Sequence, residues 1–413
     1  MLITAPSVLT GELGPAPAGP GYVLVEDGVV AEVGSGPPPR RADVALPDGV
    51  LAPGFVDLQI NGYYGVEFQI PDEASWASVA ARLPETGATA FLPTMITAPV
   101  AELAAALCKA ASFLPRLAGP ELAGPERTGA QLAASSPAGA RALGVHLEGP
   151  FIAPVRKGAH NPAWITDPTP AAIADLISAG AGVLRMVTLA PERPGALAAI
   201  DALGAAGVLV SVGHSDAIGS QVAAAVQAGA RMVTHLFNAQ RPLGHREPGV
   251  VGQALTDPGL TCGLILDLYH VTQPAATIAF AAAPGRIVLV TDAAACAGMP
   301  PGEYLLGGEP ITLPAGDGAP PVRVDGTIAG SALRMDRAVA NAVAIGVPLA
   351  AAVAAASRIP ADLIGRPDLG RLTPGAAADL VWLSPALSAR ATWIAGRLAY
   401  SDGATATLAT VFG

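Results

Sequence analysis

The segment GFVDLQINGYYG, residues 54–65, begins the pattern that decides the fold. Its first part, GFVDLQI, has the near-continuous apolar character of a strand that is buried on both faces. Further runs of this kind follow along the chain: ATAFLPTM, ALGVHLEG, GVLRMVTLA, GVLVSVGH, ARMVTHLF, LTCGLILD and RIVLVTD. Ala-rich stretches with helical character, such as EASWASVAARLPETG and QVAAAVQAGA, separate them. Eight alternating strand and helix units predict an α/β fold, a closed (β/α)8 TIM-like barrel of parallel strands.

An open, doubly wound α/β sheet is the alternative to the barrel. In its dinucleotide-binding form that fold carries a glycine-rich phosphate loop after the first strand. No such loop follows GFVDLQI, so the pattern favours the barrel.

Both ends of the chain differ from the barrel pattern. YVLVEDGVVAEVG near the N-terminus, and ADLVWLS with ATWIAGRLAY near the C-terminus, are short strand patterns without intervening helices. We expect the two ends to meet in one small β domain. The predicted boundaries are residues 1–52 and 366–413 for the small domain and residues 53–365 for the barrel. Residues 115–140 are rich in Pro, Gly and Ala and predict a mobile surface connection.

Composition and charge exclude some classes of function. The chain has 413 residues and a net charge of −10, so it lacks the basic surface that nucleic acids and anionic membranes require. The longest uncharged run, AVANAVAIGVPLAAAVAAAS, is interrupted by Gly346 and Pro348 and predicts two packed helices, not a membrane span. The N-terminal residues lack the pattern of a signal peptide. Three widely spaced cysteines suggest neither a disulfide framework nor a thiolate zinc site, and we expect a cytoplasmic protein.

Three residues of metal-ligand type stand at the ends of apolar runs. Glu148 lies in LGVHLEGP, His214 in VLVSVGHSD and His235 in RMVTHLFN. The carboxyl ends of barrel strands converge on one face, where catalytic residues lie. A single histidine at such a place is more often a hydrogen-bonded core residue. Two imidazoles and one carboxylate at three strand ends, with an open fourth position, instead predict a catalytic type of zinc site.

Asp292 ends the last apolar run, RIVLVTDA. A carboxylate at the end of a buried strand must be paired, bound to a ligand or catalytic, because burying it alone is costly. One interpretation is the N-cap of a following helix. The interpretation that we favour is a general base.

Further motifs resemble those of a known family. PGFVDLQINGYYG, GVHLEGPFI, KGAHNP, VGHSDA, THLFNAQ, REPG, LVTDA and AGSALRM occur in the order typical of N-acetylglucosamine-6-phosphate deacetylases of the amidohydrolase superfamily, and the resemblance spans nearly the whole chain. It implies a barrel with a small β-sandwich made from both termini. It also implies metal-dependent hydrolysis of the acetamide of N-acetylglucosamine 6-phosphate to glucosamine 6-phosphate and acetate. A homodimer is implied as well, in which Arg246 of REPG reaches into the site of the partner subunit.

Gln59 and Asn61 stand where a large class of metal hydrolases carries His-x-His. The two side chains are two residues apart on a strand and therefore face the same side. Amides are weak ligands for zinc, so we expect this metal position to be empty and both residues to line the site through hydrogen bonds. Glu148, His214 and His235 supply the other position independently. We therefore predict one divalent metal per chain, with zinc preferred.

The resemblance also implies roles around the substrate. Asp292 is the base that takes a proton from the attacking water and passes it to the departing amine, and His160 of KGAHNP binds the substrate and polarises its carbonyl. Arg246 and His270 of LDLYHV are the candidates for phosphate binding, because an acidic protein must place positive charge there deliberately. The other implied substrate contacts are made by Ala159, Asn238, Ala239, Ile328, Ala329 and Gly330.

Three alternatives stay open. DLYHV is bulkier than the usual family pattern and Arg241 of NAQRPL lies near the sugar side, so N-acetylgalactosamine 6-phosphate is an alternative substrate. Another amidohydrolase reaction, on a cyclic amide or an N-acyl amino acid, is disfavoured by the phosphate-binding candidates. A non-catalytic barrel that serves as a binding scaffold is disfavoured because all four site residues at the strand ends are retained.

Overall fold

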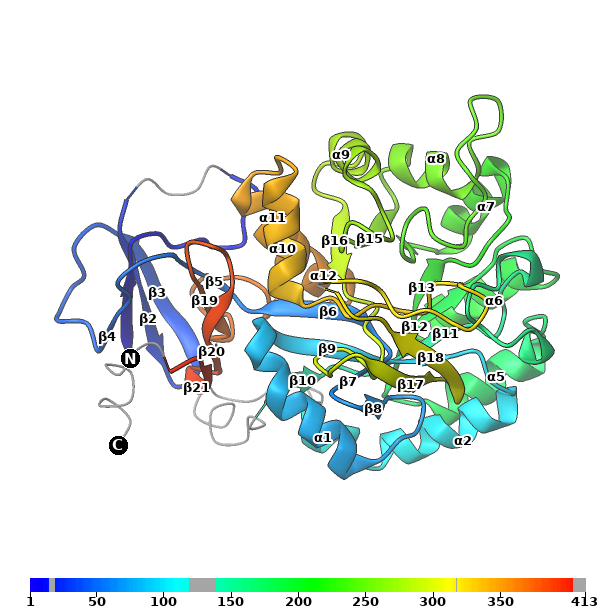
Figure 1. The fold of residues 1–413 in the computed structure, drawn as a ribbon, viewed down its shortest axis with the longest axis horizontal. Helices are drawn as coiled ribbons and strands as arrows, with labels where there is room; N and C mark the ends of the chain where they lie inside the picture. Colours follow the sequence, from blue (N-terminus) through cyan, green and yellow to red (C-terminus); the bar gives the residue numbers. More distant parts are fainter. Residues whose placement is uncertain (15–18, 119–138, 317, 404–413) are drawn as a thin grey trace.

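A parallel sheet of nine strands curls into a barrel in the computed structural model, which describes residues 1–14, 19–118, 139–316 and 318–403 (Figure 1). The strands are β6 (Phe55–Ile60), β9 (Ala88–Ile96), β10 (Arg141–Ala142), β11 (Val145–Glu148), β12 (Leu184–Leu189), β13 (Leu209–Val212), β14 (Met232–Val233), β15 (Thr261–Ile265) and β16 (Ile287–Val290). Each apolar run of the sequence contains one of these strands, and β10 is a short extra strand beside β9. The predicted TIM-like barrel is confirmed.

The barrel nearly closes between its first and last strands. Parallel ladders join β6 to β9 and run from β9 through β11 to β16. Between β6 and β16 the described residues form only an isolated bridge, Ile60 with Ala293. The Asp292 N–H donates to the Gln59 carbonyl at 2.8 Å beside this bridge. The seam therefore lies where two of the predicted site residues meet.

Helices surround the barrel strands (Figure 1). They are α1 (Glu73–Arg82), α2 (Val100–Ala111), α3 (Leu114–Ala118), α5 (Pro170–Ala179), α6 (Ala196–Ala205), α7 (Gly219–Ala228), α8 (Gly249–Thr256), α9 (Gln273–Ala282), α10 (Met335–Ala344), α11 (Leu349–Ala356) and α12 (Arg358–Leu363). α1 begins after Asp72, whose carboxylate accepts the Ser75 N–H at 2.9 Å and so satisfies one free donor of the first turn. The helix then buries Trp76 against the barrel core.

The long uncharged run forms two helices, as predicted. α10 ends at Ala344 and α11 begins at Leu349, after Gly346 and Pro348. In the part of the chain that the structure describes, no helix is long and apolar enough to cross a membrane.

Two four-stranded sheets combine the ends of the chain. One has the order β3-β2-β1-β4 and the other β21-β20-β19-β5. Their strands are β1 (Leu2–Ala5), β2 (Gly21–Glu26), β3 (Val29–Ser35), β4 (Val44–Ala45), β5 (Val50–Pro53), β19 (Leu380–Leu383), β20 (Ala389–Ile394) and β21 (Arg397–Ser401). In Figure 1 the blue and red strands lie side by side, away from the barrel. Ile3, Val23 and Trp382 belong to one hydrophobic core, separate from that of the barrel. The boundaries at residues 52/53 and 365/366 stay a prediction.

Short hairpins follow β6 and β16. β7 (Gly62–Tyr63) pairs with β8 (Val66–Glu67), and β17 (Gly302–Leu306) pairs with β18 (Glu309–Leu313). The predicted mobile connection, residues 115–140, falls largely on residues 119–138, which lie outside the described residues, so that prediction is not tested.

Candidate active site

Four polar side chains meet at the carboxyl ends of barrel strands. Glu148 is the last residue of β11, whereas His214, His235 and Asp292 each follow the last residue of their strand by two positions. All four are buried, with at most 8% exposure. His214, His235 and Asp292 have φ values of 47°, 27° and 50°, a left-handed conformation that residues other than glycine rarely adopt. Such strain persists only where the surrounding structure holds it, and it concentrates at functional sites.

Glu148, His214 and His235 bring three potential metal-ligand atoms together. Glu148 Oε1 lies 3.1 Å from His214 Nε2 and 2.9 Å from His235 Nε2, and the two nitrogens are 3.1 Å apart. Ligand atoms bound to a tetrahedral zinc at about 2.0–2.1 Å stand about 3.3 Å from one another. The triangle therefore has nearly the size that one metal ion requires.

The hydrogen bonds of His214 also fit a metal. Its Nδ1 lies 2.8 Å from the carbonyl oxygen of Arg156 and donates to it, so Nε2 of the neutral ring carries a lone pair. A lone pair cannot bond to the Glu148 carboxylate, so a proton or a metal ion must lie between them. Burial raises the pKa of Glu148, but with a proton on each Nε2 the hydrogen bonds from His214 and His235 outweigh burial and hold this pKa well below its ordinary value, so the carboxylate is charged. Two imidazoles and a carboxylate are the donors that zinc prefers.

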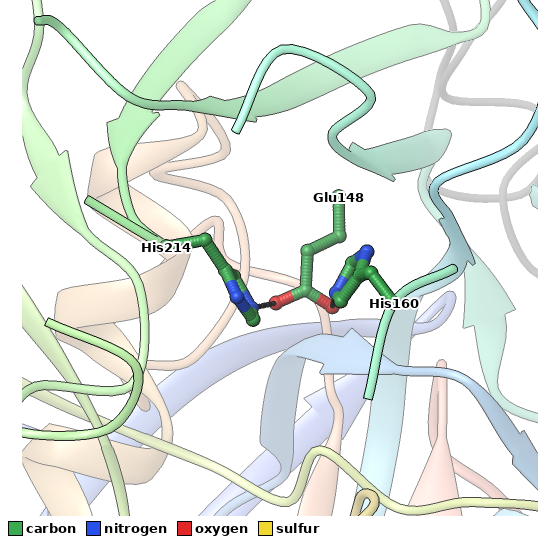
Figure 2. Close-up of side chains that lie close together, drawn as sticks. All are labelled: Glu148, His160 and His214. Carbon is green, nitrogen blue, oxygen red and sulfur yellow. Dashed lines mark hydrogen bonds and ion pairs between the residues drawn. The ribbon is translucent and has the colours of Figure 1, made fainter. Parts of the chain in front are cut away.

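His160 lies beside this triangle. The ligand atoms of Glu148, His160 and His214 are within 4.8 Å of one another, and Figure 2 shows Glu148 between the two rings. His160 Nε2 is nevertheless 3.9 Å from Glu148 Oε2, farther than His235 Nε2 is from Oε1. His160 Nδ1 lies 3.3 Å from the Thr97 N–H and 2.7 Å from the Thr97 hydroxyl; with both groups as donors, the ring proton is on Nε2. Burial lowers the pKa of His160 to about 3, so His160 is a neutral N–H donor next to the triangle.

Gln59 and Asn61 direct amide groups at the carboxylates. Gln59 Nε2 donates to Glu148 Oε1 at 3.0 Å and to Asp292 Oδ1 at 3.1 Å, and Asn61 Nδ2 donates to Asp292 Oδ1 at 2.6 Å. The two amides thus hold Glu148 and Asp292 in place. The amide oxygens, Gln59 Oε1 and Asn61 Oδ1, are buried without a hydrogen-bond partner in the described part of the chain.

Asp292 is not a helix cap, since α10 at Met335 is the next helix among the described residues. Burial raises the pKa of Asp292 to about 6, and the charge of Glu148 adds to the rise. A carboxylate with a raised pKa beside a potential metal site is suited to accept a proton and to return it.

These side chains, except that of Gln59, line a cavity of about 370 Å³. A larger cavity of about 460 Å³, next to α10, has no histidine in its lining. The smaller cavity is therefore the candidate active site. The predicted site residues that line it are Asn61, Glu148, Ala159, His160, His214, His235, Asn238, Ala239, His270, Asp292, Ile328 and Gly330.

The family model for amidohydrolases matches residues 50–399. The chain belongs to the amidohydrolase family. The N-acetylglucosamine-6-phosphate deacetylase of Danio rerio is 39% identical to this amidohydrolase over 360 residues, 84% of each chain. The N-acetylgalactosamine-6-phosphate deacetylase of Escherichia coli O157:H7 is 38% identical over 379 residues, 91% of this chain and 93% of the relative. The predicted resemblance is confirmed.

A solved structure is similarly close to this amidohydrolase. It is an aspartate-to-alanine mutant of the N-acetyl-D-glucosamine-6-phosphate deacetylase from Mycobacterium smegmatis, in complex with N-acetyl-D-glucosamine-6-phosphate. Its TM-score is 0.86 at 37% identity, and the match covers 97% of this chain and 99% of the other.

Three predicted site residues lie outside the cavity lining of the amidohydrolase. Gln59 is fully buried and contacts the site through Glu148 and Asp292. Ala329 is buried, and Arg246 is exposed on the loop between β14 and α8. Within a single chain, therefore, Arg246 does not reach the cavity.

Arg156 and Asp57 are among the residues at or beside the site that the sequence analysis missed. Arg156 lines the cavity, and its Nε donates to Asp216 Oδ1 at 2.9 Å. Arg241, expected near the sugar, also donates to Asp216, at 2.5 Å, and does not line the cavity. Asp57, a charge inside the apolar run GFVDLQI, is buried beside Thr291. A charged residue within an apolar run is a feature of the sequence by which Asp57 could have been identified. The segment RKGAH has no comparable feature that indicates a role for Arg156.

Proposed function

We propose that this amidohydrolase removes the acetyl group of N-acetylglucosamine 6-phosphate, giving glucosamine 6-phosphate and acetate. The observation that carries the proposal is the buried triangle of Glu148, His214 and His235 next to Asp292 in one cavity. The cavity has a volume within the range of small-molecule sites. The Mycobacterium smegmatis relative, solved with N-acetyl-D-glucosamine-6-phosphate, supports this choice of substrate.

N-acetylgalactosamine 6-phosphate is the second candidate substrate. The Escherichia coli O157:H7 relative named for that sugar is about as similar to this chain as the relatives named for the glucosamine form. The two sugars differ only in the configuration of one hydroxyl group. A direct comparison of rates on the two is therefore part of the test.

The cofactor in this proposal is one divalent metal ion per chain, with zinc preferred, held by Glu148, His214 and His235. A bound ion would supply Lewis acidity, which acidifies a water molecule and polarises an amide carbonyl. Gln59 and Asn61 present amide groups in place of imidazoles, and amide oxygens are weak ligands for zinc. A second metal ion therefore has no comparable set of ligands there.

Asp292 and His160 carry the proton and charge steps of the proposed reaction. Water loses a proton to Asp292 as its oxygen forms a bond to the acetyl carbon. The carbon–nitrogen bond then breaks as the same proton passes to the sugar nitrogen. The Nε2–H of His160 donates to the carbonyl oxygen, on which negative charge develops.

His270 and Arg246 bind the phosphate in this proposal. His270 lines the cavity, and its Nδ1 lies 2.6 Å from Asp267 Oδ2, which orients the ring. Arg246 is exposed and outside the cavity of its own chain, as an arginine that serves a partner subunit must be. A guanidinium matches phosphate oxygens in shape and charge.

A homodimer completes the proposed site. Large apolar side chains are exposed near Arg246 and at the cavity: Leu243 is 54% exposed, Val155 76% and Ile328 38%. Val155 and Ile328 line the cavity itself. Exposed apolar surface around a site indicates an interface, and a second copy of the chain would cover this surface and place its Arg246 at the site.

Three free cysteines fit the cytoplasmic location that we also propose.

Acetate release tests the proposed function. Purified, metal-analysed protein is assayed with N-acetylglucosamine 6-phosphate, N-acetylgalactosamine 6-phosphate and unphosphorylated N-acetylglucosamine. We expect the highest kcat/KM on the first and the lowest on the third. A preference for the galactosamine form would support the second candidate. Absence of acetate from all three would contradict deacetylation and favour another amidohydrolase reaction or a scaffold.

A further inference from the structure

Asp57 is a buried carboxylate that the proposed reaction does not use. It lies within β6, and 3% of it is exposed. Its Oδ2 accepts a hydrogen bond from Thr291 Oγ1 at 2.5 Å, and its Oδ1 accepts the N–H groups of Thr291 and Gln59 at 3.2 Å each. Burying a carboxylate is costly even when it is bonded, so a specific use for it is expected. Its donors are Gln59, which contacts Asp292, and Thr291, which precedes Asp292 in the chain.

The carboxylate of Asp57 spans the seam of the barrel. The other neighbouring barrel strands are joined by backbone ladders, but β6 and β16 form no ladder among the described residues, only the bridge between Ile60 and Ala293. The Thr291 N–H therefore has no ladder partner on β6. Asp57 Oδ1 takes the place of that backbone acceptor, and Oδ2 fixes the Thr291 side chain as well.

The residue held in this way is the one directly before Asp292. The Thr291 hydroxyl donates to Asp57 and accepts the Ala293 N–H at 3.2 Å, so it links Asp57 to the residue that follows Asp292 in the chain. The Thr291 carbonyl accepts Ser331 Oγ at 2.5 Å, and the Asp292 carbonyl accepts the Ser331 N–H at 2.8 Å. Asp292 itself has a φ of 50°. A left-handed aspartate needs such bonds on both sides to persist.

We infer that Asp57 is a positioning residue: through Thr291 it fixes the backbone that directs the Asp292 carboxylate at the substrate. The inference rests on the proposed function, in which Asp292 is the base. Asp57 does not touch the reacting atoms. It acts by setting where the Asp292 oxygens lie, and a misplacement of about 1 Å near the reacting atoms lowers the rate by about 100-fold.

A matched pair of substitutions at Thr291 tests the inference. Thr291→Val keeps the shape of the side chain and removes the hydroxyl, whereas Thr291→Ser keeps the hydroxyl. We expect Thr291→Val to lower kcat by about 10- to 100-fold, with KM and metal content near those of the wild type. Thr291→Ser should recover most of the loss. A crystal structure of Thr291→Val should show the Asp292 carboxylate moved from Asn61, which lies 2.6 Å from it in the wild type.

Thr392→Val is the control. Thr392 is also fully buried, and its hydroxyl donates to the Pro84 carbonyl at 2.7 Å, on β20 and away from the candidate site. We expect this variant to lose thermal stability while kcat stays unchanged. Wild-type kcat in Thr291→Val, together with a lowered Tm like that of the control, would indicate a purely structural role and would overturn the inference. If Thr291→Val does not fold, Thr291→Ala carries the same expectation.

A double variant separates this inference from the proposed function. Because Asp57 and Thr291 act through Asp292, adding Thr291→Val to Asp292→Asn should leave the residual rate of Asp292→Asn unchanged. A further loss equal to that of Thr291→Val alone would contradict the inference. Failure of the wild type to release acetate, or high turnover in Asp292→Asn, would instead contradict the proposed function.

Discussion

Replacing Asp292 with Asn tests the assignment of the general base. Asn has nearly the shape of Asp, and its Oδ1 can accept the same hydrogen bonds from Gln59 and Asn61 that hold Asp292 Oδ1 at 3.1 and 2.6 Å. The geometry of the site should therefore stay. Asn cannot accept the proton of a water molecule or pass it to an amine. A positioned acid–base group contributes about 10²–10⁴-fold to a proton transfer.

The expected loss in kcat follows from these two roles. Since Asp292 serves both proton transfers, Asp292→Asn should lower kcat by about 10³-fold or more, which corresponds to about 4 kcal/mol of transition-state stabilisation. Thermal stability should not fall, because burial and the nearby charge of Glu148 both disfavour the charged form of Asp292. Metal content and substrate affinity should stay close to those of the wild type.

Three measurements on Asp292→Asn check this prediction. Initial rates of acetate release give kcat, elemental analysis gives the metal content, and calorimetry gives the substrate affinity. Loss of the metal would mean that Asp292 is mainly a metal ligand. Turnover within about tenfold of the wild type would mean that another group is the base, since that loss is smaller than an acid–base group normally supplies.

Other predictions concern the metal, the phosphate and pH. His214→Ala should release the metal and abolish activity, and elemental analysis that finds the metal retained would contradict its role as a ligand. Arg246→Ala should raise KM strongly for the phosphorylated sugar but not for the unphosphorylated one. Mixing Arg246→Ala chains with Asp292→Asn chains should restore activity in mixed dimers. Absence of this rescue after confirmed subunit exchange would count against a site shared between subunits. Burial raises the pKa of Asp57 to about 7, above the usual range of a carboxyl, so the folded state of the wild type binds this proton more tightly than the unfolded chain. The contribution of Asp57 to wild-type stability should therefore fall as the pH rises from about 4 to about 7, and the Tm of Asp57→Asn relative to the wild type should rise across that window. A difference that does not change with pH would contradict this sign.

The barrel and the ends of its strands could be predicted because both depend on local patterns. Apolar runs such as LGVHLEG and VLVSVGH predict buried strands. A residue of metal-ligand type at the end of each run indicates the catalytic face of the barrel. Glu148, His214 and His235 are therefore predictable from the sequence alone. The meeting of both chain ends in paired sheets followed from the absence of helices between their short strands.

The arrangements that the sequence could not predict depend on long-range contacts. Asp57 and Thr291 are separated by 234 positions, and their bond exists only because the barrel brings its first and last strands together. The left-handed conformations of His214 and Asp292 have no local signal, since tertiary bonds rather than glycine sustain them. Gln59 and Asn61 were expected to line the site through hydrogen bonds, but the sequence does not name their partners, because the contacts with Glu148 and Asp292 depend in the same way on strands distant in sequence.

Metal titration of the metal-free protein tests the central claim most directly. Zinc is added in known ratios to protein that has been stripped by a chelator, and both bound metal and acetate release from N-acetylglucosamine 6-phosphate are measured. If Glu148, His214 and His235 hold the one metal that the reaction needs, activity rises linearly and reaches its plateau at about one zinc per chain. A plateau at about two zinc ions per chain, or full activity in protein shown to contain no metal, would contradict the account.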